Sequence, residues 1–127
     1  MSAGDMLRCR YCPHPFNFAA LSAPRLMLFT FFLVDKPGAL AQRLEIRPEH
    51  KAYLGAKAEQ IAFAGPLLSD DGKTMVGSLL VIDFPSRGEA QRWIAAEPFT
   101  RAGVYASTAI YAFQNLWTQK VGFPPAP

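Results

Sequence analysis

The segment Met27–Asp35, with the sequence MLFTFFLVD, constrains the fold of this chain more than any other. Aromatic and aliphatic residues occupy both of its alternating faces, which is typical of a strand that is covered on both sides. A Lys-Pro-Gly sequence at residues 36–38 ends it. The sequence therefore predicts a sheet in which this first strand lies in the interior.

Three further segments carry strand signals. Residues 61–68 form a short apolar run that contains Pro66. Because proline cannot donate to a strand ladder, this strand belongs at a sheet edge or at a bulge. The Asp71-Gly72 pair favours a hairpin turn, which leads into a third strand at residues 74–84, and residues 104–113 form the last strand.

Two helical regions separate these strands. After a short helical piece at residues 39–44, a helix begins near Pro48 and runs to about Gln60. A proline suits the first turn because its missing N–H needs no partner there. The second helix follows Ser86 and Glu89, which have the spacing of a capping box. It ends at Pro98, where a brief helical turn leads to the last strand.

The order strand, helix, strand, strand, helix, strand predicts an α+β fold with βαββαβ connectivity and a four-stranded antiparallel sheet. Right-handed crossovers place the first and third strands in the middle of the sheet. Both helices then lie on one face, and the other face exposes more apolar area than a monomer usually leaves uncovered. We therefore expect a homodimer in which the open sheet faces of two copies pack together.

The two ends of the chain lack such periodicity. We predict an irregular N-terminal extension at residues 1–26, a folded domain at residues 27–113 and a C-terminal tail at residues 114–127. The extension holds Cys9, Cys12 and His14. A structural zinc site needs four ligands, so no metal is expected. Two reduced thiols in a cytoplasmic protein are the simpler interpretation.

Composition limits the classes of partner. Half of the 127 residues are hydrophobic and 18% are charged, as in a single globular domain. The net charge of +3 comes from dispersed Lys and Arg residues, so nucleic-acid binding is not expected. No apolar stretch approaches the roughly 20 residues that span a bilayer, so no membrane partner is expected either.

His50 is the one histidine of the periodic region. It shares a helical stripe with apolar residues such as Leu54, so it is either a packed core residue or a group at the edge of a pocket. Imidazole can take and give a proton near neutral pH without a cofactor. A carboxylate on its other ring nitrogen would fix the tautomer, and Glu97, Asp83 and Asp35 are the candidates.

Several short motifs occur in a specific order along the chain. They are Arg43-Leu44, Arg47-Pro48-Glu49-His50, Ala64-Gly65-Pro66, Gly77-Ser78, Glu97-Pro98-Phe99 and Ala102-Gly103-Val104-Tyr105. In this order and spacing they resemble the signature of the YciI-like (YCII-related) domain family, over roughly residues 27–113. The resemblance implies a ferredoxin-like fold of the dimeric α/β barrel superfamily.

The same resemblance implies a site. Family members are suspected to be enzymes because of a histidine and an aspartate, and these positions fall on His50 and Glu97. Glutamate in place of aspartate moves the carboxylate out by one methylene. Ser78 and Arg47 are candidate substrate-binding residues, although a small residue beneath a helix and an exposed arginine are ordinary structural alternatives.

A few members of that family act on substituted aromatic diols, as in the dehydrochlorination of chlorinated hydroxyquinols. The resemblance therefore implies a small-molecule enzyme of lyase or isomerase type that transfers protons through a His/carboxylate pair, with no cofactor. A non-catalytic small-molecule-binding or interaction dimer is the alternative, and the glutamate at the aspartate position favours it.

Overall fold

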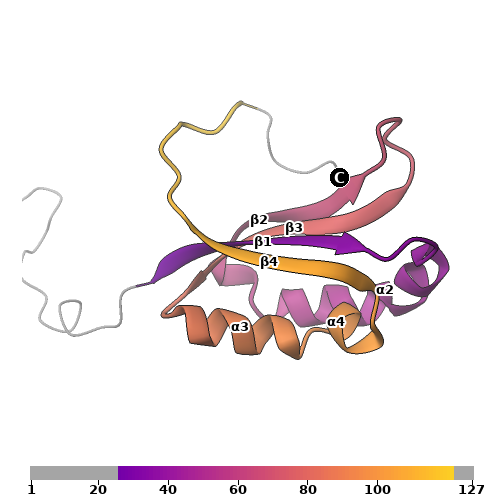
Figure 1. The fold of residues 1–127 in the computed structure, drawn as a ribbon. Helices are drawn as coiled ribbons and strands as arrows, with labels where there is room; N and C mark the ends of the chain where they lie inside the picture. Colours follow the sequence, from indigo (N-terminus) through magenta and orange to yellow (C-terminus); the bar gives the residue numbers. More distant parts are fainter. Residues whose placement is uncertain (1–25, 122–127) are drawn as a thin grey trace, which may run out of the picture.

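The four strands form one antiparallel sheet in the computed structural model, which describes residues 26–121 (Figure 1). They are β1 (Met27–Asp35), β2 (Ile61–Leu68), β3 (Met75–Phe84) and β4 (Tyr105–Phe113). Their order in the sheet is β2-β3-β1-β4, so the first and third strands are central, as right-handed crossovers require. The predicted ferredoxin-like α+β fold is confirmed. The proline-containing strand β2 lies at an edge, where its missing N–H is tolerated.

The α-helices of residues 26–121 pack on one face of this sheet (Figure 1). They are α2 (Leu40–Gly55), α3 (Arg87–Ala95) and α4 (Pro98–Ala102), and a 3₁₀ turn, η2 (Ala58–Gln60), connects α2 to β2. The core between helices and sheet is built from alternate residues of the central strands, Phe29, Phe31 and Leu33 from β1 and Leu80, Ile82 and Phe84 from β3. Alternation along a strand sends only every second side chain to this face.

The region 39–60 differs from the sequence-based prediction. Instead of two pieces that meet at Pro48, α2 is one continuous helix with Pro48 inside it, and it ends at Gly55. Pro48 cannot donate to the carbonyl of Leu44 four residues earlier. Both residues are exposed, which leaves that carbonyl within reach of water. The consequence is that Arg43 and His50 lie two turns apart on one helix face, and both are buried.

The short helix α4 is held at both ends by the residue types that its geometry needs. Glu97 is the N-cap, with its side chain accepting a hydrogen bond from the N–H of Phe99, and Pro98 occupies the first turn. Gly103 ends the helix with a φ of 77°, a left-handed conformation that favours glycine. The serine half of the predicted capping box of α3 is also formed, because the Ser86 hydroxyl accepts from the N–H of Glu89; the side chain of Glu89 pairs with Arg92.

Gly77 allows the two central strands to approach each other. A Cβ atom added there would lie 2.2 Å from the carbonyl oxygen of Leu33. That oxygen belongs to the backbone of β1, so a larger residue would force the strands apart. The residue next to it, Ser78, is consequently held at a fixed distance from β1 on the helix-covered face.

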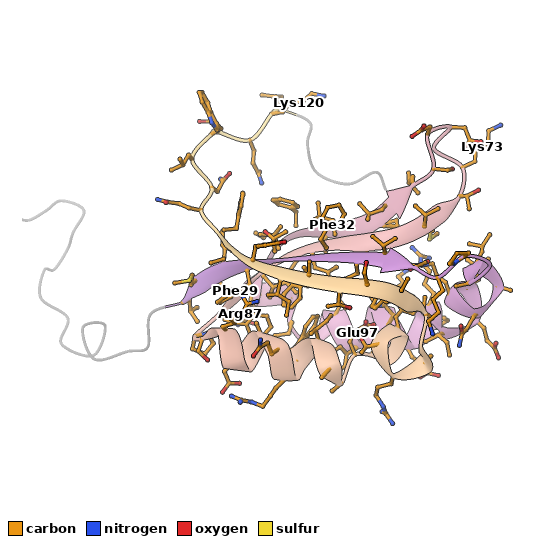
Figure 2. The ribbon with its side chains drawn as sticks, in the orientation of Figure 1. Phe29, Phe32, Lys73, Arg87, Glu97 and Lys120 are labelled. Carbon is orange, nitrogen blue, oxygen red and sulfur yellow. The ribbon has the colours of Figure 1, made fainter. Side chains whose placement is uncertain are left out.

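Within residues 26–121, no helix lies over the opposite face of the sheet (Figure 1). Phe32 points away from the helices and Phe29 points toward them (Figure 2). Phe32 is 48% exposed and Tyr111 is 63% exposed, whereas Phe29 is 3% exposed. We refer to the side that bears Phe32, Val34, Tyr111 and Phe113 as the open face.

Candidate active site

A buried hydrogen bond joins two residues that are distant in sequence. His50, on the inner face of α2, places its Nδ1 atom 2.5 Å from Oε2 of Glu97, the N-cap of α4. His50 is 7% exposed and Glu97 is fully buried. The structure therefore brings together the two residues that the sequence nominated as an acid–base pair, with Glu97 rather than Asp35 or Asp83 as the partner.

Glu97 is held by two further donors. Its Oε2 atom accepts from the N–H of Phe99 at 3.0 Å, and its Oε1 atom accepts from the hydroxyl of Tyr105 at 3.2 Å. Burial, and then the charge of Glu97, raises the pKa of Tyr105 well above its ordinary value near 10. Tyr105 is thus a neutral donor throughout the physiological range. Three donors on one carboxylate fix its orientation and offset its removal from water.

The ring of Phe99 covers the imidazole. The two ring centroids are 4.1 Å apart with an interplanar angle of 18°, so the rings are stacked. The guanidinium carbon of Arg43 lies 4.5 Å from the centroid of the same phenylalanine. Phe99 therefore contacts two α2 side chains that are seven residues, or about two helical turns, apart.

Arg43 forms a second buried polar cluster. Its Nε and Nη2 atoms donate to the two carboxylate oxygens of Asp35 at 2.7 and 3.1 Å, and Nη2 also donates to the Ser78 hydroxyl at 2.9 Å. Arg43 is 1% exposed, so this planar, bidentate pair with Asp35 is almost fully desolvated.

The role of Arg43 in the site was missed by the sequence analysis. The signal that could have found it is its spacing, because residues seven apart on a continuous helix share a face. The helix break predicted at Pro48 separated Arg43 from His50, and the pairing of Arg43 with Asp35 was not considered.

A pocket of about 260 Å³ opens beside these clusters. Its lining consists of Arg43, Arg47, His50, Lys51, Leu54, Ala64, Gly65, Pro66, Ser78 and Leu80. Because Nδ1 of His50 is engaged by Glu97, the ring nitrogen left for a ligand in this pocket is Nε2. One side of the lining is cationic and the other, from β2 and β3, is apolar or small.

The remaining nominated residues are distributed as follows. Ser78 and Arg47 both line the pocket; Ser78 is buried, and Arg47 is half-buried in the middle of α2. Asp35 pairs with Arg43. Asp83 is paired with Leu28 in the register of β1 and β3 and faces the open side, away from His50.

Within residues 26–121, no group of three or more His, Cys, Asp or Glu side chains is placed to hold a metal ion. Cys9, Cys12 and His14 lie outside the described residues. None of the helices in the described region is long and apolar enough to cross a membrane.

Fold and site together define a class: a ferredoxin-like α+β domain with a buried histidine–carboxylate pair beside a cationic pocket. The model of the YCII-related domain matches residues 27–114. The chain belongs to the YCII-related domain family, as the motifs around His50 and Glu97 indicated.

Individual relatives agree with this assignment. The chain is 31% identical over 98 residues to the protein YciI of Escherichia coli O6:H1, a match that spans 72% of this chain and all of that protein. An uncharacterized protein of Haemophilus influenzae has the same identity and coverage.

A solved structure is also similar to this one. It is 5-chloro-2-hydroxyhydroquinone dehydrochlorinase from Burkholderia phenoliruptrix AC1100, in complex with 2,5-dihydroxybenzoquinone. It shares 32% sequence identity with a TM-score of 0.63, and the match covers 76% of this chain and 98% of that one.

Proposed function

We propose that this protein is a small-molecule enzyme of lyase or isomerase type, in which His50 transfers a proton and Glu97 orients it. The observation that carries the proposal is the hydrogen bond between Nδ1 of His50 and the fully buried carboxylate of Glu97, beside a pocket. The similarity to a dehydrochlorinase supports a small-molecule reaction of this kind.

The proposed chemistry follows from the tautomer that Glu97 selects. With Nδ1–H donated to the carboxylate, Nε2 carries the lone pair and acts as the base. It takes a proton from a substrate C–H or O–H. In an elimination, the electron pair left behind forms a double bond as an anionic leaving group departs. In an isomerisation, the imidazolium returns the proton to another substrate atom.

The rest of the pocket has complementary roles in this proposal. Ser78 and Arg47 bind the substrate, and the apolar wall from Leu54, Pro66 and Leu80 receives a cyclic or aromatic body. No step requires a cofactor, because both the base and its orienting group are side chains of this chain.

We also propose that the working form is a homodimer joined through the open face. Phe32, Val34 and Tyr111 are exposed on that face, and a second copy that packs against it would remove these apolar side chains from water. This arrangement leaves the helix-covered side, with the His50 pocket, at the outside of each copy.

The test is a panel of chlorinated and hydroxylated aromatic compounds, screened for turnover with the wild-type chain and with His50→Gln. We expect His50→Gln to reduce turnover by a factor of about 10² to 10⁴. Circular dichroism and thermal unfolding of the same sample establish that the variant is folded. Lys73→Gln, which changes the tip of the β2–β3 hairpin (Figure 2), is the matched control and should keep full activity.

The competing candidate is a non-catalytic binding dimer. It predicts that His50→Gln alters ligand affinity or the melting temperature, and that no member of the panel is turned over. A compound that is converted equally fast by wild type and by His50→Gln would also contradict the proposed role of His50.

A further inference from the structure

The guanidinium of Arg43 is oriented by two neighbouring side chains. Its Nε and Nη2 atoms each donate a hydrogen bond to the carboxylate of Asp35, and the second N–H of Nη2 donates to the hydroxyl of Ser78. Within residues 26–121, no acceptor is paired with Nη1. Arg43 lines the pocket, so the two Nη1 N–H groups are the part of this buried cation that can serve a ligand.

Three contacts preorganise this cation. The bidentate pair with Asp35 fixes its plane, Ser78 fixes one corner, and Phe99 packs against it at 4.5 Å. Donors that are already oriented and desolvated stabilise a negative oxygen without reorganisation, and they act more strongly than the same groups in water. An exposed arginine would lose most of this benefit.

The charges around the pocket point in the same direction. Its lining holds three cations, Arg43, Arg47 and Lys51, and no carboxylate. Two buried carboxylates stand behind it, Asp35 on Arg43 and Glu97 on His50. With a neutral imidazole, this group of side chains has one positive charge in excess, and a monoanionic ligand would balance it.

We infer that the pocket takes a small anion with an apolar, ring-sized body, and that Nη1 of Arg43 binds its anionic oxygen. The apolar body lies against Leu54, Pro66 and Leu80, as in the proposed function, on which this inference rests for the location of the site. Arg43 is then a specificity-determining residue: it selects carboxylate-like or phenolate-like oxygens over neutral groups of the same shape.

The experiment compares two probes of nearly equal shape and different charge, benzoate and benzamide. Each is titrated into the ¹⁵N-labelled full chain, and dissociation constants are read from the chemical shifts of Leu54, Ser78 and Leu80. We expect benzoate to bind the wild type at least about tenfold more tightly than benzamide, as a charge-assisted contact to a buried guanidinium predicts. Equal affinities, or no binding of benzoate, would overturn the inference.

Variants assign that preference to Arg43. Arg43→Gln alone leaves Asp35 buried without a cation, so the double variant Asp35→Asn/Arg43→Gln is used, which keeps a neutral hydrogen-bonding pair. In this double variant, the dissociation constants of benzoate and benzamide should become about equal. Lys73→Gln, with the loss of one distant positive charge, should retain the wild-type preference. A double variant that keeps the preference, or an Arg47→Gln protein that loses it instead, would refute the role of Arg43.

Failure of anion binding by Arg43 and failure of the proposed proton transfer by His50 give different results. His50→Gln should retain the preference for benzoate, because Nη1 of Arg43 and not the imidazole makes the distinguishing contact. A chain that prefers benzoate but converts no compound of the panel would leave this inference intact and refute the enzyme. A chain that converts a neutral compound through His50 but does not prefer benzoate would support the enzyme and refute this inference.

Discussion

The two faces of the sheet use neighbouring residues of the same strands in opposite ways. Phe31 and Phe32 are adjacent in β1, yet Phe31 is fully buried under the helices and Phe32 is 48% exposed. The covered face is a core of large apolar side chains, whereas the open face leaves Phe32, Val34, Tyr111 and Phe113 exposed. The difference teaches that the apolar character of a residue does not by itself show whether the chain covers it.

Polar groups make a second difference between the faces. The covered face holds four buried polar or charged side chains, Arg43, His50, Ser78 and Glu97. Each has at least one hydrogen-bond partner among the described residues. Burying such groups is costly unless they are paired. These four paired polar side chains lie together beside the pocket, and an apolar core would not need them.

The largest effect should come from breaking the polar pairing on the covered face. Glu97→Ala removes the partner of His50, the acceptor of Tyr105 and the N-cap of α4. We expect a loss of about 3 kcal/mol in the free energy of unfolding, because one partner of a buried pair is left without the other. Urea unfolding at pH 7 measures it.

The control for that experiment is Glu89→Ala in α3. Glu89 pairs with Arg92 on the surface, where the two side chains are 52% and 70% exposed, so the loss should stay below about 0.5 kcal/mol. Comparable losses for both variants would mean that burial does not distinguish the two carboxylates.

The second largest effect should come from a charge on the open face, which should weaken association of the proposed dimer. Phe32→Asp places a charge in the middle of the proposed dimer interface. We expect the association constant to fall by at least about a hundredfold, since a buried unpaired charge opposes assembly. Light scattering should show a mass near twice 14.0 kDa for the wild type and near 14.0 kDa for the variant.

A matched change on the covered side sharpens this comparison. Gln91→Asp alters an exposed residue of α3, on the outer surface of the helices, and should leave the dimer intact. A wild-type chain that remains monomeric at micromolar concentration would contradict the proposed assembly for this protein.

The fold was predictable from the sequence because short sequence patterns within each strand indicate where the strand lies in the sheet. Apolar residues on both faces of β1, the right-handed crossovers and the proline in β2 were sufficient to place the central and edge strands. The same kind of local reasoning failed at Pro48. A proline usually begins or breaks a helix, but here the packing of Arg43, His50 and Leu54 against α4 and the sheet keeps both halves of α2 aligned.

The site was predictable only in part, for a related reason. His50 and Glu97 could be nominated from the motifs, but the choice between Glu97, Asp35 and Asp83 depended on tertiary geometry. Asp83 could have been excluded by its strand parity, because it alternates with the buried Ile82 and Phe84. Asp35 could not have been excluded in this way, since its side chain lies on the covered face. It pairs with Arg43 and not with His50, because α2 is continuous and brings Arg43 to that face.

The smallest effect contrasts two tyrosines of β4, one on each side of the sheet. Tyr105 is 9% exposed and contacts Glu97, whereas Tyr111 is 63% exposed on the open face. Burial, followed by the charge of Glu97, raises the pKa of Tyr105 in the folded chain above the unfolded value near 10. Between these two values the unfolded chain binds fewer protons, so the free energy of unfolding must fall as pH rises.

The stabilising contribution of Tyr105 is therefore complete below pH 10 and lost above it, with a slope of up to about 1.4 kcal/mol per pH unit. Tyr105→Phe should flatten the decline in urea-unfolding stability between pH 9.5 and 11 relative to the wild type. Tyr53, whose pKa is also raised by burial and by Glu97, is present in both proteins and cancels in their comparison. Parallel declines in the two proteins would show that the pKa of Tyr105 is not raised in the folded chain.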